Sequence, residues 1–191
     1  MRSFNGRSIV SRERRSNDSV MVGGIEFALD TAFRKYWHTV QMAEVQTTNR
    51  DDLKFGDIVW VHHFVDDQIL PWGENLSFVE YSQVYCRMRK NEIETLGNFL
   101  LVEPITYGDL GTARNENGLI LSTKSEKENA DRIGVARLLS DRAKEFGLND
   151  GDRVLFNRNC EYEILVDGKI YYRMELQDVI CTIDKSTKIK V

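Results

Sequence analysis

The residue types that most often carry catalysis or bind metals are few in this chain, and their spacing matches no familiar site. His62 and His63 are adjacent at the end of an expected strand, so their side chains should point to opposite faces and not share a metal ion. The cysteines form no Cys-x-x-Cys pair and are scattered: Cys86, Cys160 and Cys181. The chain also lacks a glycine-rich phosphate loop, a nucleophile elbow and a His-Glu-x-x-His motif. We therefore expect no metal, no cofactor and no enzymatic activity.

A binding role is favoured instead by an aliphatic tripeptide inside a polar connection. The segment from about Thr106 to Arg132 is rich in Gly, Ser, Glu and Lys, and it cannot bury enough apolar surface to order itself. Leu119–Leu121 lies in its middle. Apolar side chains in such a loop indicate capture by a partner protein. The alternative is that these three residues form one more edge strand.

Composition and charge exclude several classes of protein. The chain has 191 residues, 41% of them hydrophobic, and a net charge of −4 from 26 basic and 30 acidic residues. These values are ordinary for a globular protein and do not favour a nucleic-acid partner. The odd number of cysteines fits a reducing compartment, and no apolar run reaches the roughly 18 residues of a membrane span. We expect a cytoplasmic protein with no membrane partner.

Short strands are the main elements that must position the tripeptide. Ile58–Val61 and Val154–Phe156 are apolar runs that each follow a Gly-Asp pair, and Phe99–Val102 is a third run that ends close to Pro104. Asp167-Gly168 between two apolar runs predicts a tight hairpin turn. Strands of this length between turn signals favour a small all-β barrel.

Helix is sparse in the sequence. Ser140–Phe146 is expected to form one or two turns, with Ser140 or Asp141 as N-cap and Gly147 just beyond the C-terminus. Ala28–Trp37 is a second candidate, because Phe33 and Trp37 are spaced four apart.

Three landmarks occur twice, in the same order, and indicate an internal duplication. A loop glycine, Gly24 or Gly118, is followed after 32 or 33 residues by Gly56-Asp57 or Gly151-Asp152. An Arg-Met pair then follows the turn glycine after 31 residues in the first copy and 22 in the second. We interpret the difference as an extra hairpin near residues 68–78 of the first copy. The predicted division is one barrel over residues 1–96, a second over 97–184, and a basic tail over 185–191.

The second copy resembles the GroES co-chaperonins over nearly its whole length. Five segments match that family's first strand, mobile loop, following strand, Gly-Asp turn and C-terminal pattern, namely Phe99–Val102, Gly118–Leu121, Gly134–Ala136, Leu148–Phe156 and Met174–Ile180. The first copy resembles the family less. It places Gly23–Phe27 at the mobile loop and Leu53–Val59 at the turn, and Met88–Ile93 keeps the methionine spacing with Glu in place of Asp.

The resemblance implies two tandem small GroES-like β-barrels with long mobile loops, an oligomeric ring, and capping of a GroEL-type chaperonin in its nucleotide-bound state. The expected chaperonin-binding residues are the mobile-loop positions of both copies, namely Gly118, Leu119, Ile120, Leu121, Gly24, Ile25, Glu26 and Phe27. In the first copy Glu26 replaces an aliphatic residue. A carboxylate in an apolar groove is costly unless it is paired, so we expect this loop to bind weakly or to bind something else.

Two stretches depart from the resemblance. Glu44–Lys54 and Arg137–Asn149 are short and lack the hairpin that often forms a roof in the family. The alternative function is therefore a non-chaperone structural or scaffolding protein, for example a viral assembly component, that reuses the GroES-like barrel.

Overall fold

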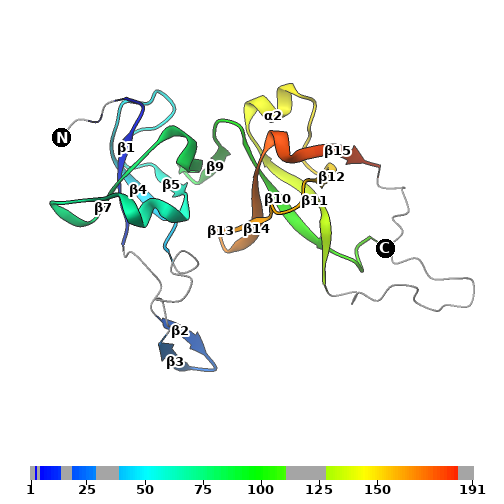
Figure 1. Ribbon diagram of the computed structural model, residues 1–191, viewed down its shortest axis with the longest axis horizontal. Coiled ribbons are helices and arrows are strands. Elements are labelled where there is room, and N and C mark those ends of the chain that lie inside the picture. The colour runs from blue at the N-terminus through cyan, green and yellow to red at the C-terminus, as the bar shows by residue number, and fades with distance from the viewer. Residues whose placement is uncertain (1–2, 4, 14–18, 29–38, 111–127, 185–191) are drawn as a thin grey trace, which may run out of the picture. The chain divides into compact units, whose positions relative to one another are not determined.

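The structure is a computed structural model that describes residues 3, 5–13, 19–28, 39–110 and 128–184. The chain divides into two compact units, Met1–Glu94 and Thr95–Val191. Each unit is built on an antiparallel sheet, and helix is limited to a few short turns (Figure 1). The predicted all-β, two-domain class is thereby confirmed. The hydrogen-bonded strands of the described residues form open sheets, with no pairing that closes either into a barrel.

The first unit contains a seven-stranded sheet with the order β6-β7-β1-β4-β5-β8-β9. Its strands are β1 (Ser8–Ser11), β4 (Met42–Thr48), β5 (Ile58–Val61), β6 (Ile69–Leu70), β7 (Gly73–Val79), β8 (Val84–Arg89) and β9 (Glu92–Thr95). Two 3-10 helices connect them, η1 (His63–Gln68) and η2 (Tyr81–Gln83). A separate two-stranded sheet is formed by β2 (Ser19–Val22) and β3 (Ile25–Ala28).

The second unit contains a six-stranded sheet with the order β13-β14-β10-β11-β12-β15. Its strands are β10 (Phe99–Thr106), β11 (Asn129–Leu139), β12 (Arg153–Phe156), β13 (Tyr162–Val166), β14 (Lys169–Glu175) and β15 (Val179–Ile183). The helix α2 (Asp141–Glu145) and the 3-10 helix η3 (Leu176–Asp178) complete it. Apart from β9, the strand orders of the two units are the same.

Both units contain the same Gly-Asp turn with the same hydrogen bonds. Gly56 has a φ of 82°, and its N–H donates to the carbonyl of Val45 at 2.9 Å. The Asp57 carboxylate accepts from the Lys54 N–H at 2.7 Å. Such a positive φ favours glycine, which has no Cβ to clash. The second unit repeats these contacts at Gly151, Ala136, Asp152 and Asn149.

Beyond this turn, three landmarks lie at the same distance from the turn glycine in both units. Val79 lies opposite Ser8, and Met174 lies opposite Leu100; each of the two buried side chains follows its turn glycine by 23 residues. η2 and η3 both begin 25 residues after that glycine, and both carry the same reciprocal cap between side chain and backbone. β8 and β15 then begin 28 residues after it.

The predicted nine-residue insertion in the first copy is therefore wrong. A hairpin does lie near residues 68–78, formed by β6 and β7, but β13 and β14 hold the equivalent place in the second unit. The two Arg-Met pairs are not equivalent, because Met88 lies in β8 whereas Met174 lies in β14. The position that corresponds to Met174 is Val79.

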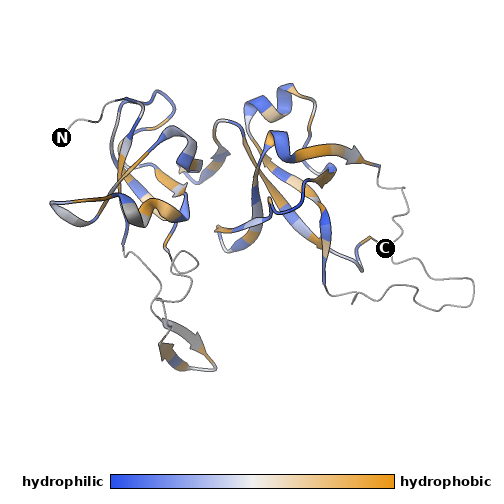
Figure 2. Cartoon of the chain, in the orientation of Figure 1, coloured by the Kyte–Doolittle hydropathy of each residue, from blue (hydrophilic) through white to orange (hydrophobic). Residues whose placement is uncertain are grey.

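Each unit packs an apolar core behind its sheet, visible as apolar strand segments in Figure 2. In the first unit Val10, Val45, Val59 and Val61 are completely buried. The main core of the second unit comprises Leu100, Val102, Ala136, Leu139, Ala143, Leu148, Val154, Phe156, Cys160, Tyr172 and Met174. These residues hold the strands from which the long connections extend.

The short stretches before the Gly-Asp turns contain no hairpin, as the sequence predicts. In the second unit this stretch holds α2, whose N-cap is Ser140: its hydroxyl accepts from the Ala143 N–H at 3.4 Å. Gly147 follows α2 with a φ of 91°. The other predicted helix, Ala28–Trp37, falls almost entirely outside the described residues; Ala28 itself ends β3.

Candidate functional site

The predicted loop of the first copy contains a hairpin. β2 and β3 pair so that Val22 lies opposite Ile25, and the two-residue connection is Gly23-Gly24. Both glycines have positive φ, 59° and 84°, as a type I′ turn requires. This turn matches the natural twist of an antiparallel pair, so the local sequence itself favours the hairpin.

One face of this hairpin is apolar and exposed. Successive side chains of a strand alternate between faces, so Ile25 and Phe27 share one face, and Val22 joins them as the partner of Ile25. Their side chains are 57% (Val22), 62% (Ile25) and 50% (Phe27) exposed. Three large apolar residues on one side of a small hairpin are a candidate contact surface for a partner protein.

Glu26 lies on the opposite face of the hairpin, where its carboxylate accepts a hydrogen bond from the Ser19 hydroxyl at 2.5 Å. The prediction that Glu26 weakens binding assumed that its carboxylate enters the same groove as its neighbours. The alternation of the strand separates it from Ile25 and Phe27. A partner that contacts only the apolar face would leave this carboxylate in water.

The corresponding loop of the second copy is described only at its stem. The predicted contact residues Gly118, Leu119, Ile120 and Leu121 lie outside the described residues. At the stem, Thr106 pairs with Asn129, and the Tyr107 N–H donates to the carbonyl of Glu128 at 3.0 Å. The stem therefore joins the ends of β10 and β11 on either side of the loop.

A polar turn reinforces the stem. The Asp109 carboxylate accepts from the Thr106 N–H at 2.8 Å and from the Thr106 hydroxyl at 2.7 Å. These hydrogen bonds lower the pKa of Asp109 despite some opposing burial. Tyr107 and Leu110 are buried beside it with Ile105, Ala130 and Ile133. The loop thus begins and ends on a packed base.

The histidines do not lie as the sequence predicts. His63 begins η1 instead of continuing the strand, and its ring stacks beside that of His62 with centroids 4.1 Å apart. The Nδ1 atom of His62 accepts from the Phe64 N–H at 3.0 Å and so caps η1. Within the described ranges there is no group of three or more His, Cys, Asp or Glu side chains placed to hold a metal ion.

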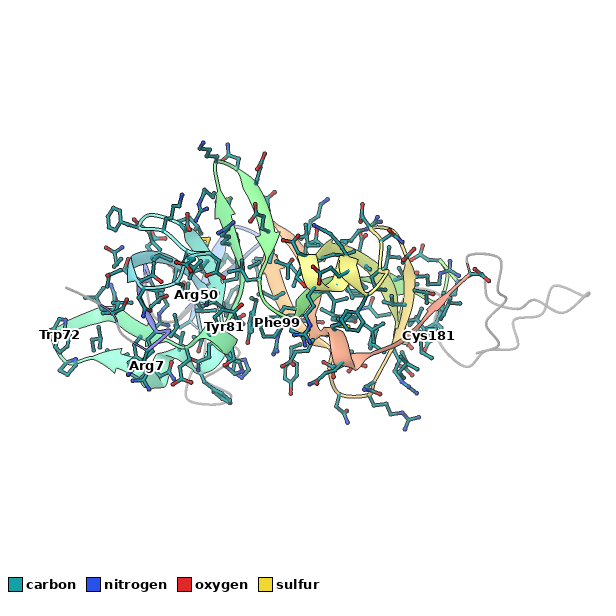
Figure 3. The ribbon with its side chains drawn as sticks, turned by 90° about the horizontal axis from the view of Figure 1, so that it is seen from above. Arg7, Arg50, Trp72, Tyr81, Phe99 and Cys181 are labelled. Atoms are coloured by element: carbon teal, nitrogen blue, oxygen red, sulfur yellow. The ribbon has the colours of Figure 1, made fainter. Side chains whose placement is uncertain are left out.

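The cysteines differ in accessibility. Burial raises the pKa of Cys86 to about 12 and, together with nearby acidic groups, that of Cys160 to about 11. Cys181 is exposed on β15 (Figure 3). All three are free thiols. A buried thiol with a raised pKa is a poor nucleophile, because the thiolate is the reactive form.

Sequence reasoning missed an ion-pair cluster around the first Gly-Asp turn. The Arg89 guanidinium donates to both oxygens of Asp57, at 2.8 and 2.5 Å. Arg50, almost fully buried, donates to both oxygens of Asp52 at 2.8 and 2.6 Å, and stacks 4.1 Å from the centre of the Tyr81 ring (Figure 3). The i, i+2 spacing of Arg50 and Asp52 was a weak signal, whereas Arg89 lies 32 residues from its partner.

No helix among the described residues has both the length and the apolar character to cross a membrane. No family model matches the chain. Several curated proteins, however, are similar to part of the chain. The chain is 30% identical over 94 residues to the co-chaperonin GroES of Petrotoga mobilis, covering 48% of this chain and 97% of the relative.

Other GroES relatives give a similar result. The chain is 26% identical over 92 residues to the co-chaperonins GroES of Thermotoga petrophila and of Thermotoga maritima, covering 47% of this chain and 94% of each relative. Each match therefore spans nearly a whole GroES chain but only about half of this one, the length of a single unit. The chain belongs to the GroES co-chaperonin family.

Proposed function

We propose that this protein is a tandem co-chaperonin. Two copies of a GroES-like unit, joined in one chain, associate into a ring and cap a GroEL-type chaperonin in its nucleotide-bound state. The protein assists folding as a non-catalytic lid in the cytoplasm. The equal strand orders and the identical spacing after the Gly-Asp turns support the duplication, and the GroES relatives support the chaperonin partner.

The observation that carries the proposal is the exposed apolar face of the β2–β3 hairpin. It lies at the place where the resemblance puts the mobile loop of the first copy, and its side chains are Val22, Ile25 and Phe27. Fully burying such a side chain contributes roughly 1.5–3 kcal/mol. Because these three are about half exposed, a partner that covers them gains on the order of 4 kcal/mol in total.

A gain of this size fits the task only when several contacts act together. Fixing an unordered residue costs about 1–2 kcal/mol, so a loop that orders on binding loses most of its gain. A hairpin that already holds its binding conformation avoids much of that cost. Each contact is still weak alone, and a ring of linked copies multiplies weak contacts into a stable complex.

Co-sedimentation with a GroEL-type chaperonin, with and without ATP, tests the proposal. We expect ATP-dependent binding by the native chain, loss of binding in Ile120→Asp, and weaker binding in Ile25→Asp. Ala28→Asp is the matched control, since Ala28 is exposed on the same hairpin but faces the side opposite to Ile25. It should bind as the native chain does.

One outcome would overturn the proposed function, and another would overturn only the role assigned to the hairpin. A folded native chain that binds the chaperonin in no nucleotide state favours the scaffolding alternative. Equal losses in Ile25→Asp and Ala28→Asp, by contrast, would remove the assigned role of the apolar face while leaving a chaperonin partner in place.

A further inference from the structure

The two units differ at the place where the first strand passes the neighbouring hairpin. In the first unit β1 pairs with β7, and the Arg12 N–H extends this pairing by donating to the carbonyl of Asn75 at 3.0 Å. In the second unit β14 lies between β13 and β10 (Figure 1), and its pairing with β10 ends at Val102 and Tyr172. The residue two positions further along β10 is Pro104.

The strand register makes Pro104 the counterpart of Arg12. Ser8 and Leu100 hold the same position in their sheets, and Arg12 and Pro104 each follow by four residues. By the same register, Ile170 holds the place of the residue whose carbonyl accepts from Arg12. Proline has no N–H, so the carbonyl of Ile170 lacks the donor that its counterpart has in the first unit.

The first unit buries an arginine side chain at this place. Arg12 is 3% exposed, and its guanidinium donates to the Ser77 hydroxyl at 3.3 Å. The 3-10 helix η1 also packs against β7. The second unit has neither feature, because proline replaces the arginine and residues 157–161, which connect β12 with β13, contain no helix.

An open cavity of about 430 Å³ lies at this place in the second unit. It is lined by Glu103, Pro104, Asn129, Glu163, Lys169, Ile170 and Tyr171. This volume is within the range of sites that bind small ligands. Beside the cavity, Ile170 and Leu165 lie opposite each other and are 54% and 62% exposed. The second unit therefore offers a surface site where the first unit holds an arginine of its own.

Glu163 gives this site a charge that suits arginine. Glu163 lies opposite Tyr172, as Ile69 lies opposite Ser77 in the first unit. Residues opposite each other in an antiparallel pair share one face of the sheet. Because the guanidinium of Arg12 contacts Ser77, Glu163 lies on the face that corresponds to the position of that guanidinium. A carboxylate thus replaces an apolar residue beside the place of the missing arginine.

The other two charged residues of the cavity lie on the opposite face. Side chains alternate along a strand, so Lys169 faces away from the side of Ile170, and Glu103 faces away from the side of Pro104. The carboxylate of Glu103 accepts a hydrogen bond from the Arg137 guanidinium at 2.6 Å. Glu163 is therefore the charged lining residue on the face that the first unit fills with arginine.

We propose that this cavity binds an arginine side chain that is presented by an extended segment of another protein. The N–H of that arginine donates to the carbonyl of Ile170, and its guanidinium pairs with Glu163. Arg12 is the template, since its N–H and side chain hold the equivalent positions in the first unit. A planar guanidinium can form two hydrogen bonds to a carboxylate, so arginine is preferred over lysine. The site requires no chaperonin.

Fluorescence anisotropy with the full native chain tests the site. The probe is a short labelled peptide of alternating threonine and valine with one central arginine. The control peptide carries citrulline, which has nearly the shape of arginine but no charge. We expect the arginine peptide to bind about tenfold or more tightly than the citrulline peptide. Its binding should also shift the NMR signals of the Ile170 and Tyr171 amides.

Three variants locate the contact. Glu163→Gln should weaken binding of the arginine peptide by about tenfold. Glu161→Gln is the matched control, because Glu161 lies outside the cavity lining, and it should bind as the native chain does. Pro104→Arg restores the residue of the first unit, so its own N–H and side chain should fill the site and abolish binding. Thermal unfolding verifies that each variant is folded.

Several results would overturn the inference. Equal affinity for the two peptides, or unchanged binding by Glu163→Gln, would mean that the site does not recognise arginine. Retained binding by Pro104→Arg would place the peptide elsewhere. Absence of binding by the folded native chain at every concentration would mean that the chain itself covers the cavity. Binding that appears only on dilution would mean that a second copy occupies it.

Discussion

Replacing the aspartate of the Gly-Asp turn should have unequal effects in the two units. Asp57 is 4% exposed and accepts three hydrogen bonds, one from the Lys54 N–H and two from Arg89. Asp152 occupies the same position in the second unit, and the bond to its carboxylate comes from the Asn149 N–H at 2.8 Å. The substitutions Asp57→Ala and Asp152→Ala therefore compare two equivalent turns, one in which the aspartate also pairs with an arginine and one in which it accepts the backbone hydrogen bond.

The contacts set the expected magnitudes. Losing the backbone bond alone costs roughly 1 kcal/mol, as for a helix cap, and this is the expected cost of Asp152→Ala. Asp57→Ala also removes a bidentate ion pair, and breaking a buried pair costs about 3–5 kcal/mol. Arg89 is 29% exposed and can regain water, so the lower end of that range, about 3 kcal/mol, is expected for the first unit.

The distribution of tryptophan makes the measurement specific. All three tryptophans lie in the first unit, and Trp60 is buried in its core. Urea unfolding followed by tryptophan fluorescence therefore reports the first unit. Hydrogen exchange of the amides in β10, β11 and β12 reports the second. Equal losses of stability in the two variants would refute the reasoning, because they would mean that the Arg89 pair contributes nothing beyond the turn.

The same pair predicts how stability depends on pH. Burial alone would raise the pKa of Asp57, but the hydrogen bonds from Arg89 and Lys54 outweigh it and hold the pKa below its ordinary value. A carboxylate with a lowered pKa stabilises the fold above its unfolded pKa of about 3.9 and loses that contribution as pH falls through the folded value. The first unit should lose stability below about pH 4, and less steeply in Asp57→Ala.

Two further predictions concern the second unit. Gly134→Ala should destabilise it by roughly 1–3 kcal/mol, because a Cβ would lie 2.4 Å from Val102 Cγ1 and 2.8 Å from the Glu103 carbonyl oxygen. Ala43→Gly, at the equivalent place in the first unit, should cost only about 0.5–1 kcal/mol. Urea titrations of the two variants compare these losses of stability. Ser140→Ala should cost about 0.5–1 kcal/mol by loss of the α2 cap, whose hydrogen bond is long at 3.4 Å. Faster hydrogen exchange at the amides of Ala143 and Lys144 would detect this loss of stability.

Local signals were sufficient to predict much of the fold. The Gly-Asp turns, the hairpin turn at Asp167-Gly168 and the N-cap of α2 each depend on a few adjacent residues with distinctive backbone preferences. Gly23-Gly24 between Val22 and Ile25 is a signal of the same kind. Because this segment was assigned to a mobile loop by resemblance, its hairpin was not predicted. The separation of Glu26 from the apolar face was therefore missed as well.

The wrong assignment of the Arg-Met pairs has a different cause. Met174 and Val79 share a position because each is buried opposite the first strand of its unit, and either side chain satisfies that requirement. Met88 has the same identity as Met174 but pairs with Ile58 in another strand. Burial and register define equivalence in a sheet, whereas matching letters do not. The ion pair of Asp57 with Arg89 was missed because its two residues lie 32 positions apart in the sequence and meet only when β8 pairs with β5.

The shared spacing limits where the two units can differ in function. From the turn glycine to the start of β8 or β15 the number of residues is the same in both units, 28, and so is the order of the strands, so these segments serve as a common scaffold. Among the described residues the differences lie in the connection after the first strand, in the stretch before the turn, where the second unit adds α2, after β5, where the first unit adds η1, and after β8, where the first unit adds β9. The first of these differences is the place to which we assign chaperonin contact, because there the first unit carries the exposed apolar face of the β2–β3 hairpin.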